Sequence, residues 1–154
     1  MERLSAEGVD YVVCGGVACV LHGCQRTTLD LDLNISLTEE NLLRAIRAFK
    51  TLGLSPRVPV PLESLVDPLQ RQDWIQTKGA MVFTVQSPDG LLQIDLFLVY
   101  LIPFEDLKRD AVTVVVSDWK ISVSSIHHLI QAKEAIEPKR PKDLFDLAEL
   151  RNKR

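Results

Sequence analysis

An apolar run near the start of the chain predicts the first buried strand. The run spans Tyr11–Cys14 and is followed at once by two glycines, Gly15 and Gly16. Its continuous apolar character indicates a strand covered on both faces. The next residues, Val17–His22, predict a short helix, and Gly23 provides a helix-ending residue. This stretch therefore predicts a strand, a tight glycine turn and a helix in quick succession.

A second strand follows a polar turn and has two kinds of face. Residues two apart in a strand point the same way, so Asp30 and Asp32 share one face. The alternate positions face the opposite side and predict contact with the core: Leu29, Leu31 and Leu33. The leucines should hold the strand in place, which keeps the two carboxylates close together.

Periodicity along the rest of the chain predicts a mixture of helices and strands. A helix capped by Ser36 or Thr38 should run to Gly53, with one apolar stripe: Leu42, Leu43, Ile46 and Phe49. Residues 55–73 hold four prolines, which exclude a long helix there and indicate an irregular segment that could cover a substrate. The later predicted strands are Met81–Val85, Leu91–Val99, Ala111–Val116 and Trp119–Val123. The later predicted helices are Trp74–Lys78, Pro103–Arg109, one from Ser124 or Ser125 to about Ile136, and Lys142–Leu150. The last of these helices should pack through Leu144, Leu147, Ala148 and Leu150.

Length and composition favour one compact unit. The chain has 154 residues, 46% of them hydrophobic and 25% charged, which is enough apolar surface for a real core. We expect one domain over 1–154, with a core over 9–123 and C-terminal helices over 124–152. Its class should be α/β (α+β), with a short, mixed, twisted sheet, helices mainly on one face and two closing helices. The net charge of −3 gives no overall sign of a nucleic-acid surface.

The cysteines and the absence of long apolar runs bear on the compartment. Cys14, Cys19 and Cys24 form neither a disulfide framework nor a zinc-binding pattern, so buried thiols in a reducing compartment are expected. No charged-then-apolar leader and no run of membrane-spanning length occurs. These features predict a cytoplasmic protein without a membrane partner.

The paired aspartates predict a cation site. Two carboxylates this close repel each other unless a cation lies between them, and oxygen ligands suit Mg²⁺, with Mn²⁺ as an alternative. Asp95 is the single charge in the apolar strand Leu92–Phe97, and burying it without a partner would cost free energy. It could meet the same cation, or it could lie at a strand end or face solvent.

Several motifs in order resemble the DNA polymerase β-like nucleotidyltransferase superfamily. They are the glycine pair, the short helix and the run Arg26-Thr27-Thr28-Leu29-Asp30-Leu31-Asp32, with Asp95 matching the third carboxylate. The tail around Lys133 and residues 139–147 is similar to small bacterial stand-alone nucleotidyltransferase-like proteins related to abortive-infection toxins. The resemblance covers residues 11–150 except 55–73.

The resemblance implies a nucleotidyl-transfer site built from three groups of residues. The carboxylates would hold two metal ions and carry catalysis: Asp30, Asp32 and Asp95. Contacts to the triphosphate would come from the glycine turn and nearby polar residues: Gly15, Gly16, Arg26, Thr28 and Lys133. Asp143 and Asp146 would order Lys133 or Arg140 by charge pairing. Surface roles for Arg26 and Lys133, and a helix-dipole role for Asp143, stay open as alternatives.

Two functional hypotheses follow, and a third is weaker. The first is an active enzyme that moves a nucleoside monophosphate from a nucleoside triphosphate to an RNA end, a protein hydroxyl or a small molecule. The second is an inactive nucleotide- or partner-binding module, such as one half of a toxin–antitoxin pair. A metal phosphohydrolase is less favoured, because its usual histidine ligands are missing from the aspartate motif.

Overall fold

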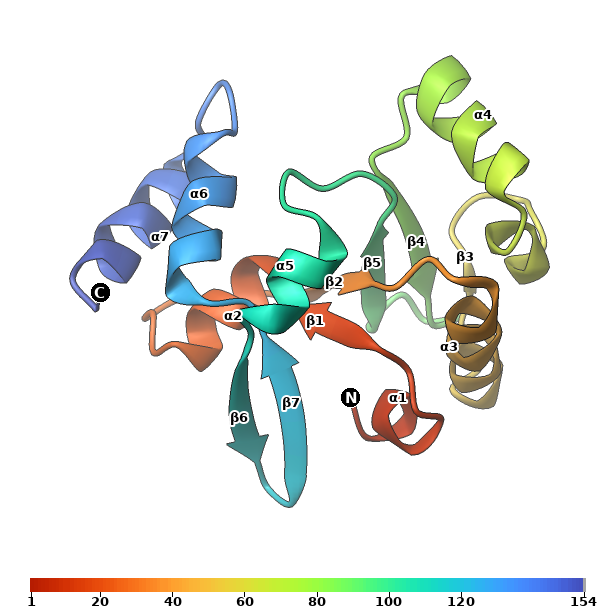
Figure 1. The fold of residues 1–154 in the computed structure, drawn as a ribbon, viewed down its shortest axis with the longest axis horizontal. Helices are drawn as coiled ribbons and strands as arrows, with labels where there is room; N and C mark the ends of the chain where they lie inside the picture. Colours follow the sequence, from red (N-terminus) through yellow and green to blue (C-terminus); the bar gives the residue numbers. More distant parts are fainter. Residues whose placement is uncertain (154) are drawn as a thin grey trace.

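A mixed seven-stranded sheet runs through the molecule, and the computed structural model describes residues 1–153 of it (Figure 1). The strands are β1 (Tyr11–Val13), β2 (Asp30–Ile35), β3 (Ser55–Pro56), β4 (Val82–Gln86), β5 (Gln93–Phe97), β6 (Val112–Val116) and β7 (Trp119–Val123). The helices are α1 (Glu2–Ala6), α2 (Gly15–Leu21), α3 (Glu39–Thr51), the 3₁₀ helix η1 (Leu62–Leu65), α4 (Pro68–Lys78), α5 (Phe104–Arg109), α6 (Ile126–Glu134) and α7 (Pro141–Arg151). The predicted mixed α/β class is confirmed.

Strand pairing places β2 at the centre of the sheet. The strand order is β3-β4-β5-β2-β1-β7-β6. β2 runs parallel to β5 and antiparallel to β1, whereas β1 runs parallel to β7. β2, β5 and the end of β1 therefore meet, although they come from distant parts of the chain.

The alternation in β2 sorts its side chains as the sequence predicts, except at its start. Leu33 and Ile35 are fully buried in the larger core, and Leu31 packs against it. Asp30 and Asp32 lie on the opposite face, towards a cavity. The prediction for Leu29 is wrong, because this side chain is 88% exposed. It precedes the first paired residue of β2, Asp30, so no neighbouring strand covers it.

Helix α4 corrects the prediction for the proline-rich segment. It begins at Pro68 rather than at Trp74, and Asp67 caps it by accepting hydrogen bonds from the backbone N–H groups of Leu69 and Gln70. Proline is tolerated in the first helical turn, where its missing N–H would have no helical partner. The helix could therefore start inside a stretch whose prolines indicated irregular structure. The short η1 and β3 lie in the rest of that segment.

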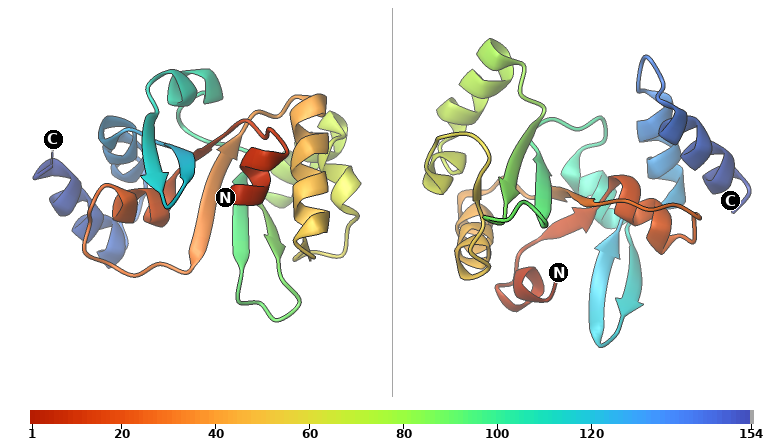
Figure 2. Two further views of the ribbon diagram at one scale, coloured as in Figure 1. Left: turned by 90° about the horizontal axis from the view of Figure 1, so that it is seen from below. Right: turned by 180° about the vertical axis from the view of Figure 1, so that it is seen from behind.

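Two pairs of helices lie at opposite ends of the molecule, and two of these helices bury fewer apolar side chains than predicted. α6 and α7 lie side by side at one end, and α3 and α4 lie at the other (Figures 1 and 2). α3 buries Leu42, Ile46 and Phe49, but Leu43 is 41% exposed, which contradicts its predicted place on the inward stripe. In α7, Leu147 and Leu150 are buried as predicted. Leu144, which is 55% exposed, and Ala148, which is also exposed, lie on the solvent side of the helix, so their predicted packing is wrong.

The β6–β7 hairpin projects from the body of the molecule (Figures 1 and 2). Val114 and Ile121 pair across it, and Ile121 is buried, so its base joins the larger core. Among residues 1–153, none of the helices combines the length and the apolar character needed to cross a bilayer.

Candidate active site

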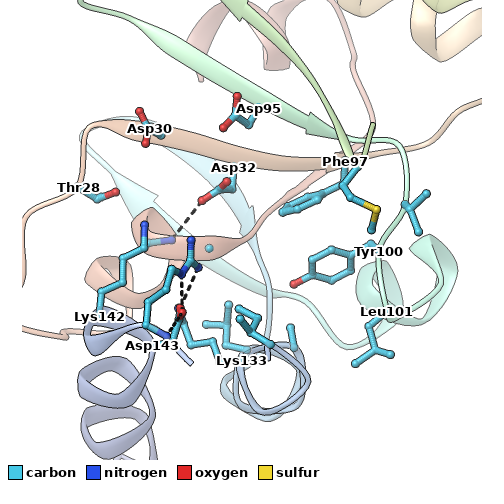
Figure 3. A pocket seen from close by; sticks show the side chains of 18 of the residues that line it. Thr28, Asp30, Asp32, Asp95, Phe97, Tyr100, Leu101, Lys133, Lys142 and Asp143 are labelled. Atoms are coloured by element: carbon cyan, nitrogen blue, oxygen red, sulfur yellow. Dashed lines mark hydrogen bonds and ion pairs between the residues drawn. The ribbon is translucent and has the colours of Figure 1, made fainter. Parts of the chain in front are cut away.

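The three aspartates meet at one cavity because of the strand register. Asp32 and Asp95 are direct partners across the parallel pair β2–β5, and Asp30 pairs with Gln93 two residues earlier. Residues two apart in a strand share a face, so all three carboxylates lie on one side of the sheet. Figure 3 shows them above and beside the cavity, which they line.

The glycine turn packs directly against one of these carboxylates. Gly15 has φ +59°, and a Cβ built on it would lie 1.9 Å from Asp32 Oδ2. The Gly16 N–H donates a 3.4 Å hydrogen bond to the same oxygen, and a Cβ on Gly16 would lie 2.7 Å from Thr28 Oγ1. Both positions therefore exclude any side chain. The sequence predicts that the glycines let phosphates approach the backbone; the contact that the structure shows at Gly15 is with Asp32.

Asp95 is held by its neighbours on the sheet. Thr84 Oγ1 donates a 2.6 Å hydrogen bond to Asp95 Oδ1, and Gln93 Nε2 lies 3.3 and 3.4 Å from the two carboxylate oxygens. Within residues 1–153, no group of three or more His, Cys, Asp and Glu side chains is already arranged to hold a metal ion. The three carboxylates share one face of the sheet and line one cavity, but their present positions do not make a complete metal-binding site.

The electrostatics of Asp32 favour a bound cation. Burial raises the pKa of the Asp32 carboxyl above its usual value, and the Asp95 and Asp30 carboxylates raise it further. The Gly16 N–H and the Lys133 ammonium lower this pKa in part. A divalent ion would relieve both the burial and the repulsion, and carboxylate oxygens are the donors that Mg²⁺ prefers. Asp30, Asp32 and Asp95 therefore fit a divalent ion, both because they are carboxylates and because the strand register brings them to one face.

A buried ion-pair network supports the opposite wall of the cavity. Asp146 Oδ2 lies 2.6 Å from both Arg26 Nη1 and Lys133 Nζ, and Asp143 Oδ1 lies 3.6 Å from Lys133 Nζ. Both aspartates are fully buried, and Lys133 is nearly so. Buried charges are stable only when paired. The network therefore joins α6, α7 and the turn before β2 into one unit.

Two further cations reach the cavity from the start of α7. Arg140 Nε donates a 2.6 Å hydrogen bond to Asp143 Oδ2 and also lines the cavity. The hydrogen-bonded Asp143 raises the pKa of Arg140, and the more distant Asp32 carboxylate adds to that effect. Lys142 extends towards the aspartates in Figure 3. Neither residue was among the predicted phosphate-binding groups.

The cavity has a volume of about 420 Å³. Every predicted site residue lines it except Asp146, which lies behind Lys133 and Arg26. Its remaining surface includes five apolar or aromatic residues that form one stretch, here called the apolar wall: Met81, Phe97, Val99, Tyr100 and Leu101. The Phe97 and Tyr100 rings pack with their centroids 4.6 Å apart.

Comparison with solved structures identifies the architecture. The lincosamide antibiotic adenylyltransferase LnuA, solved with lincomycin bound, matches with a TM-score of 0.64 and 15% identity, over 99% of this chain and 92% of that one. ANT(2″)-Ia in complex with adenylyl-2″-tobramycin matches with a TM-score of 0.61 and 12% identity, over 98% and 83%. A nucleotidyltransferase-like protein from Paracoccidioides brasiliensis gives 0.54 and 17%, over 97% and 70%. The chain has the nucleotidyltransferase fold. No protein-family model and no curated protein sequence matches it.

Within this nucleotidyltransferase fold, the residues missed by sequence reasoning share one property. Arg140, Lys142 and the apolar wall reach the cavity through the packing of distant parts of the chain, not through a local motif. One signal was available for Arg140, because it stands three residues before Asp143, at the spacing of a helix-start pair. The run 96–103 carries no charge, but an apolar run by itself indicates only burial.

Proposed function

We propose that this protein is a metal-dependent nucleotidyltransferase that moves a nucleoside monophosphate from a nucleoside triphosphate to an acceptor hydroxyl. One observation carries the proposal: Asp32 pairs with Asp95 across β2 and β5, beside Asp30 and a glycine turn that a side chain would fill. The likeness in fold to an adenylyltransferase supports it.

The aspartates would hold the metal, most simply Mg²⁺, with Mn²⁺ as an alternative. A bound divalent ion supplies charge neutralisation for the leaving pyrophosphate and lowers the pKa of the attacking hydroxyl. Asp30 and Asp32 would hold this ion from β2, and Asp95 would hold it from β5. Asp95 would also accept the proton of the acceptor hydroxyl, because its carboxylate lines the cavity and is held there by hydrogen bonds from Thr84 and Gln93.

The positively charged side chains that line the cavity would bind the triphosphate: Arg26, Lys133, Arg140 and Lys142. Arg26 and Lys133 face the cavity and stay positioned through their shared partner Asp146. Arg140 is positioned in the same way by Asp143. Gly15, Gly16 and Thr28 line the cavity beside the aspartates and would contact the phosphates there, and Lys142 adds a further positive charge. Positively charged side chains stabilise a bound phosphate through charge-assisted hydrogen bonds to its oxygens.

Transfer of label from a nucleoside triphosphate tests the proposal. Full-length protein with Mg²⁺ and each α-phosphate-labelled triphosphate should label an acceptor in an extract that supplies RNA, proteins and small molecules. Asp32→Asn and Asp30→Asn should abolish labelling. Asp118→Asn, which removes an exposed acid in the β6–β7 turn, should not. Equal labelling by all the variants would contradict the proposal.

The acceptor belongs to one of three classes: an RNA end, a protein hydroxyl or a small molecule. Two similar structures are described with antibiotics, lincomycin in one and an adenylylated tobramycin in the other. Those descriptions favour a small molecule.

A non-catalytic nucleotide- or partner-binding module is the second candidate. One observation favours it: among residues 1–153, the carboxylates are not already gathered around a metal position. Triphosphate binding that is independent of Mg²⁺, measured by calorimetry, would support this candidate. Co-purification with a stable toxin or antitoxin partner would support it as well.

A further inference from the structure

The cavity is divided into a charged half and an uncharged half. In Figure 3, Thr28, Asp30 and Lys142 lie on one side of Asp32, whereas Phe97, Tyr100 and Leu101 lie on the other. Phe97 shares its strand and its face with Asp95, two residues away. The apolar wall therefore begins directly beside the third carboxylate and continues away from the cations.

We propose that the apolar wall is the acceptor subsite, and that the acceptor is a small, uncharged molecule with an apolar body and a free hydroxyl. This inference rests on the proposed nucleotidyl transfer. In an in-line displacement, the attacking hydroxyl approaches the α-phosphorus from the side opposite the departing pyrophosphate. The cations attract the pyrophosphate to their half of the cavity, so the hydroxyl enters from the half that carries the apolar wall.

The reaction at this subsite is balanced by the groups present. An oxygen lone pair of the acceptor hydroxyl forms a bond to the α-phosphorus. The bond from that phosphorus to the oxygen bridging to the β-phosphate breaks, and pyrophosphate leaves with the bonding electrons. The hydroxyl proton passes to the Asp95 carboxylate and then to water. The product is the acceptor joined to a nucleoside monophosphate through a phosphodiester.

The surroundings of the wall select the class of acceptor. Residues 96–103 contain no charged side chain, so an RNA backbone arriving here would meet no basic partner in this run. Leu101 is 55% exposed and Met81 is 54% exposed, which leaves apolar surface for a ligand to cover. The cavity of about 420 Å³ also has to hold the nucleotide, so the part of the acceptor that enters it must be small.

A matched pair of glycosides tests the subsite without requiring catalysis. Hexyl and methyl β-D-glucopyranoside carry the same hydroxyls and differ only in the apolar tail. Binding of each to full-length protein, with Mg²⁺ and a nonhydrolysable triphosphate present, is measured by ligand-observed NMR. Hexyl glucoside should bind at least about tenfold more tightly, because burial of each added methylene is favourable.

Variants at the rim separate the wall from other parts of the surface. Leu101→Gln and Met81→Gln, which add a polar group but no charge, should each remove most of the preference for hexyl glucoside while leaving triphosphate affinity unchanged. Leu69→Gln is the control, because Leu69 is 74% exposed on α4 and does not line the cavity. Thermal unfolding of each variant checks that the fold is kept.

The outcomes distinguish the proposals. Weaker triphosphate binding by Leu101→Gln with unchanged glucoside binding would mean that the wall holds the nucleobase, and would overturn the inference. So would equal binding of the two glucosides, or binding of a short single-stranded RNA that Leu101→Gln abolishes. A preserved hexyl preference without any label transfer would leave the subsite standing and reject the proposed enzymatic function.

Discussion

Thr84 and Asp95 face each other across β4 and β5, and the threonine hydroxyl donates a 2.6 Å hydrogen bond to Asp95 Oδ1. The same carboxylate is the direct neighbour of Asp32 on the other side of β5. Asp95 therefore stands between a hydroxyl that fixes its rotamer and a carboxylate that repels it. Its position depends on both.

Removing the Thr84 hydroxyl should weaken the response to metal. Thr84→Val keeps the side-chain shape but removes the donor, and a hydrogen bond to a charged group contributes about 1.5–3 kcal/mol. We expect the Mg²⁺ concentration for half-maximal label transfer to rise about tenfold. Thr84→Ser, which keeps the hydroxyl, should behave like the original protein. An unchanged Mg²⁺ requirement in Thr84→Val would show that Gln93 alone positions Asp95.

A methyl group at the glycine turn should disable the site without unfolding the chain. In Gly15→Ala, the new Cβ would meet Asp32 Oδ2 at 1.9 Å and would displace this carboxylate. Gly53→Ala is a matched control, because Gly53 also has positive φ, +67°, but has nothing within 4 Å of a Cβ. Both variants should lose about 1–2 kcal/mol of stability from the left-handed backbone. Only Gly15→Ala should lose label transfer; equal loss in both would contradict a direct clash with Asp32.

Loss of the buried lysine should destabilise the fold. Lys133→Met leaves Asp146 and Asp143 buried with fewer positive partners, and breaking a buried pair in this way costs about 3 kcal/mol or more. Lys50→Met removes an exposed ion pair with Glu63, which solvent screens, and should change the free energy of unfolding far less than Lys133→Met. Urea unfolding followed by circular dichroism measures both. Similar losses would indicate that the network is not stabilising α6 against α7.

Alkaline pH should weaken the fold through its buried thiols. Burial raises the pKa of Cys14 and that of Cys19, each to about 12 from 9.0. Between these values the unfolded chain releases protons that the folded chain keeps, so stability is full below about pH 9 and falls as the pH rises towards about 12. The double variant Cys14→Ala/Cys19→Ala should lose less stability between about pH 8 and about pH 10.5. Urea unfolding at both pH values makes this comparison, and identical losses would contradict it.

The aspartates could be placed from the sequence because strand geometry is local. A period of two sets Asp30 and Asp32 on one face, and a lone charge in an apolar strand draws attention to Asp95. The predictions for Pro68 and Leu29 were wrong because the effect of a proline on a helix, and the burial of a leucine in a strand, depend on the position of the residue within the element. A proline at the first helical turn costs nothing there, and a leucine one residue before the paired strand has no neighbour to cover it.

The cationic and apolar halves of the cavity could not be predicted in the same way. Arg140 and Lys142 become cavity residues only because α7 returns beside α6, which the buried pairs of Asp143 and Asp146 require. The apolar wall continues from β5 into the next loop, where Phe97 packs on Tyr100, and the backbone N–H groups of Leu98 and Val99 bring Met81 beside this loop by donating to its carbonyl oxygen. Such contacts join residues that are distant in sequence, and no short pattern encodes them.

The order in which the site's parts occur along the chain matters during synthesis. A ribosome-bound chain that ends before residue 139 already carries all three carboxylates, the glycine turn and the apolar wall. It lacks Arg140, Lys142 and the two acids that hold Lys133 and Arg26 in place. A growing polypeptide should therefore remain unable to capture a triphosphate until α7 has been synthesised and has packed beside α6.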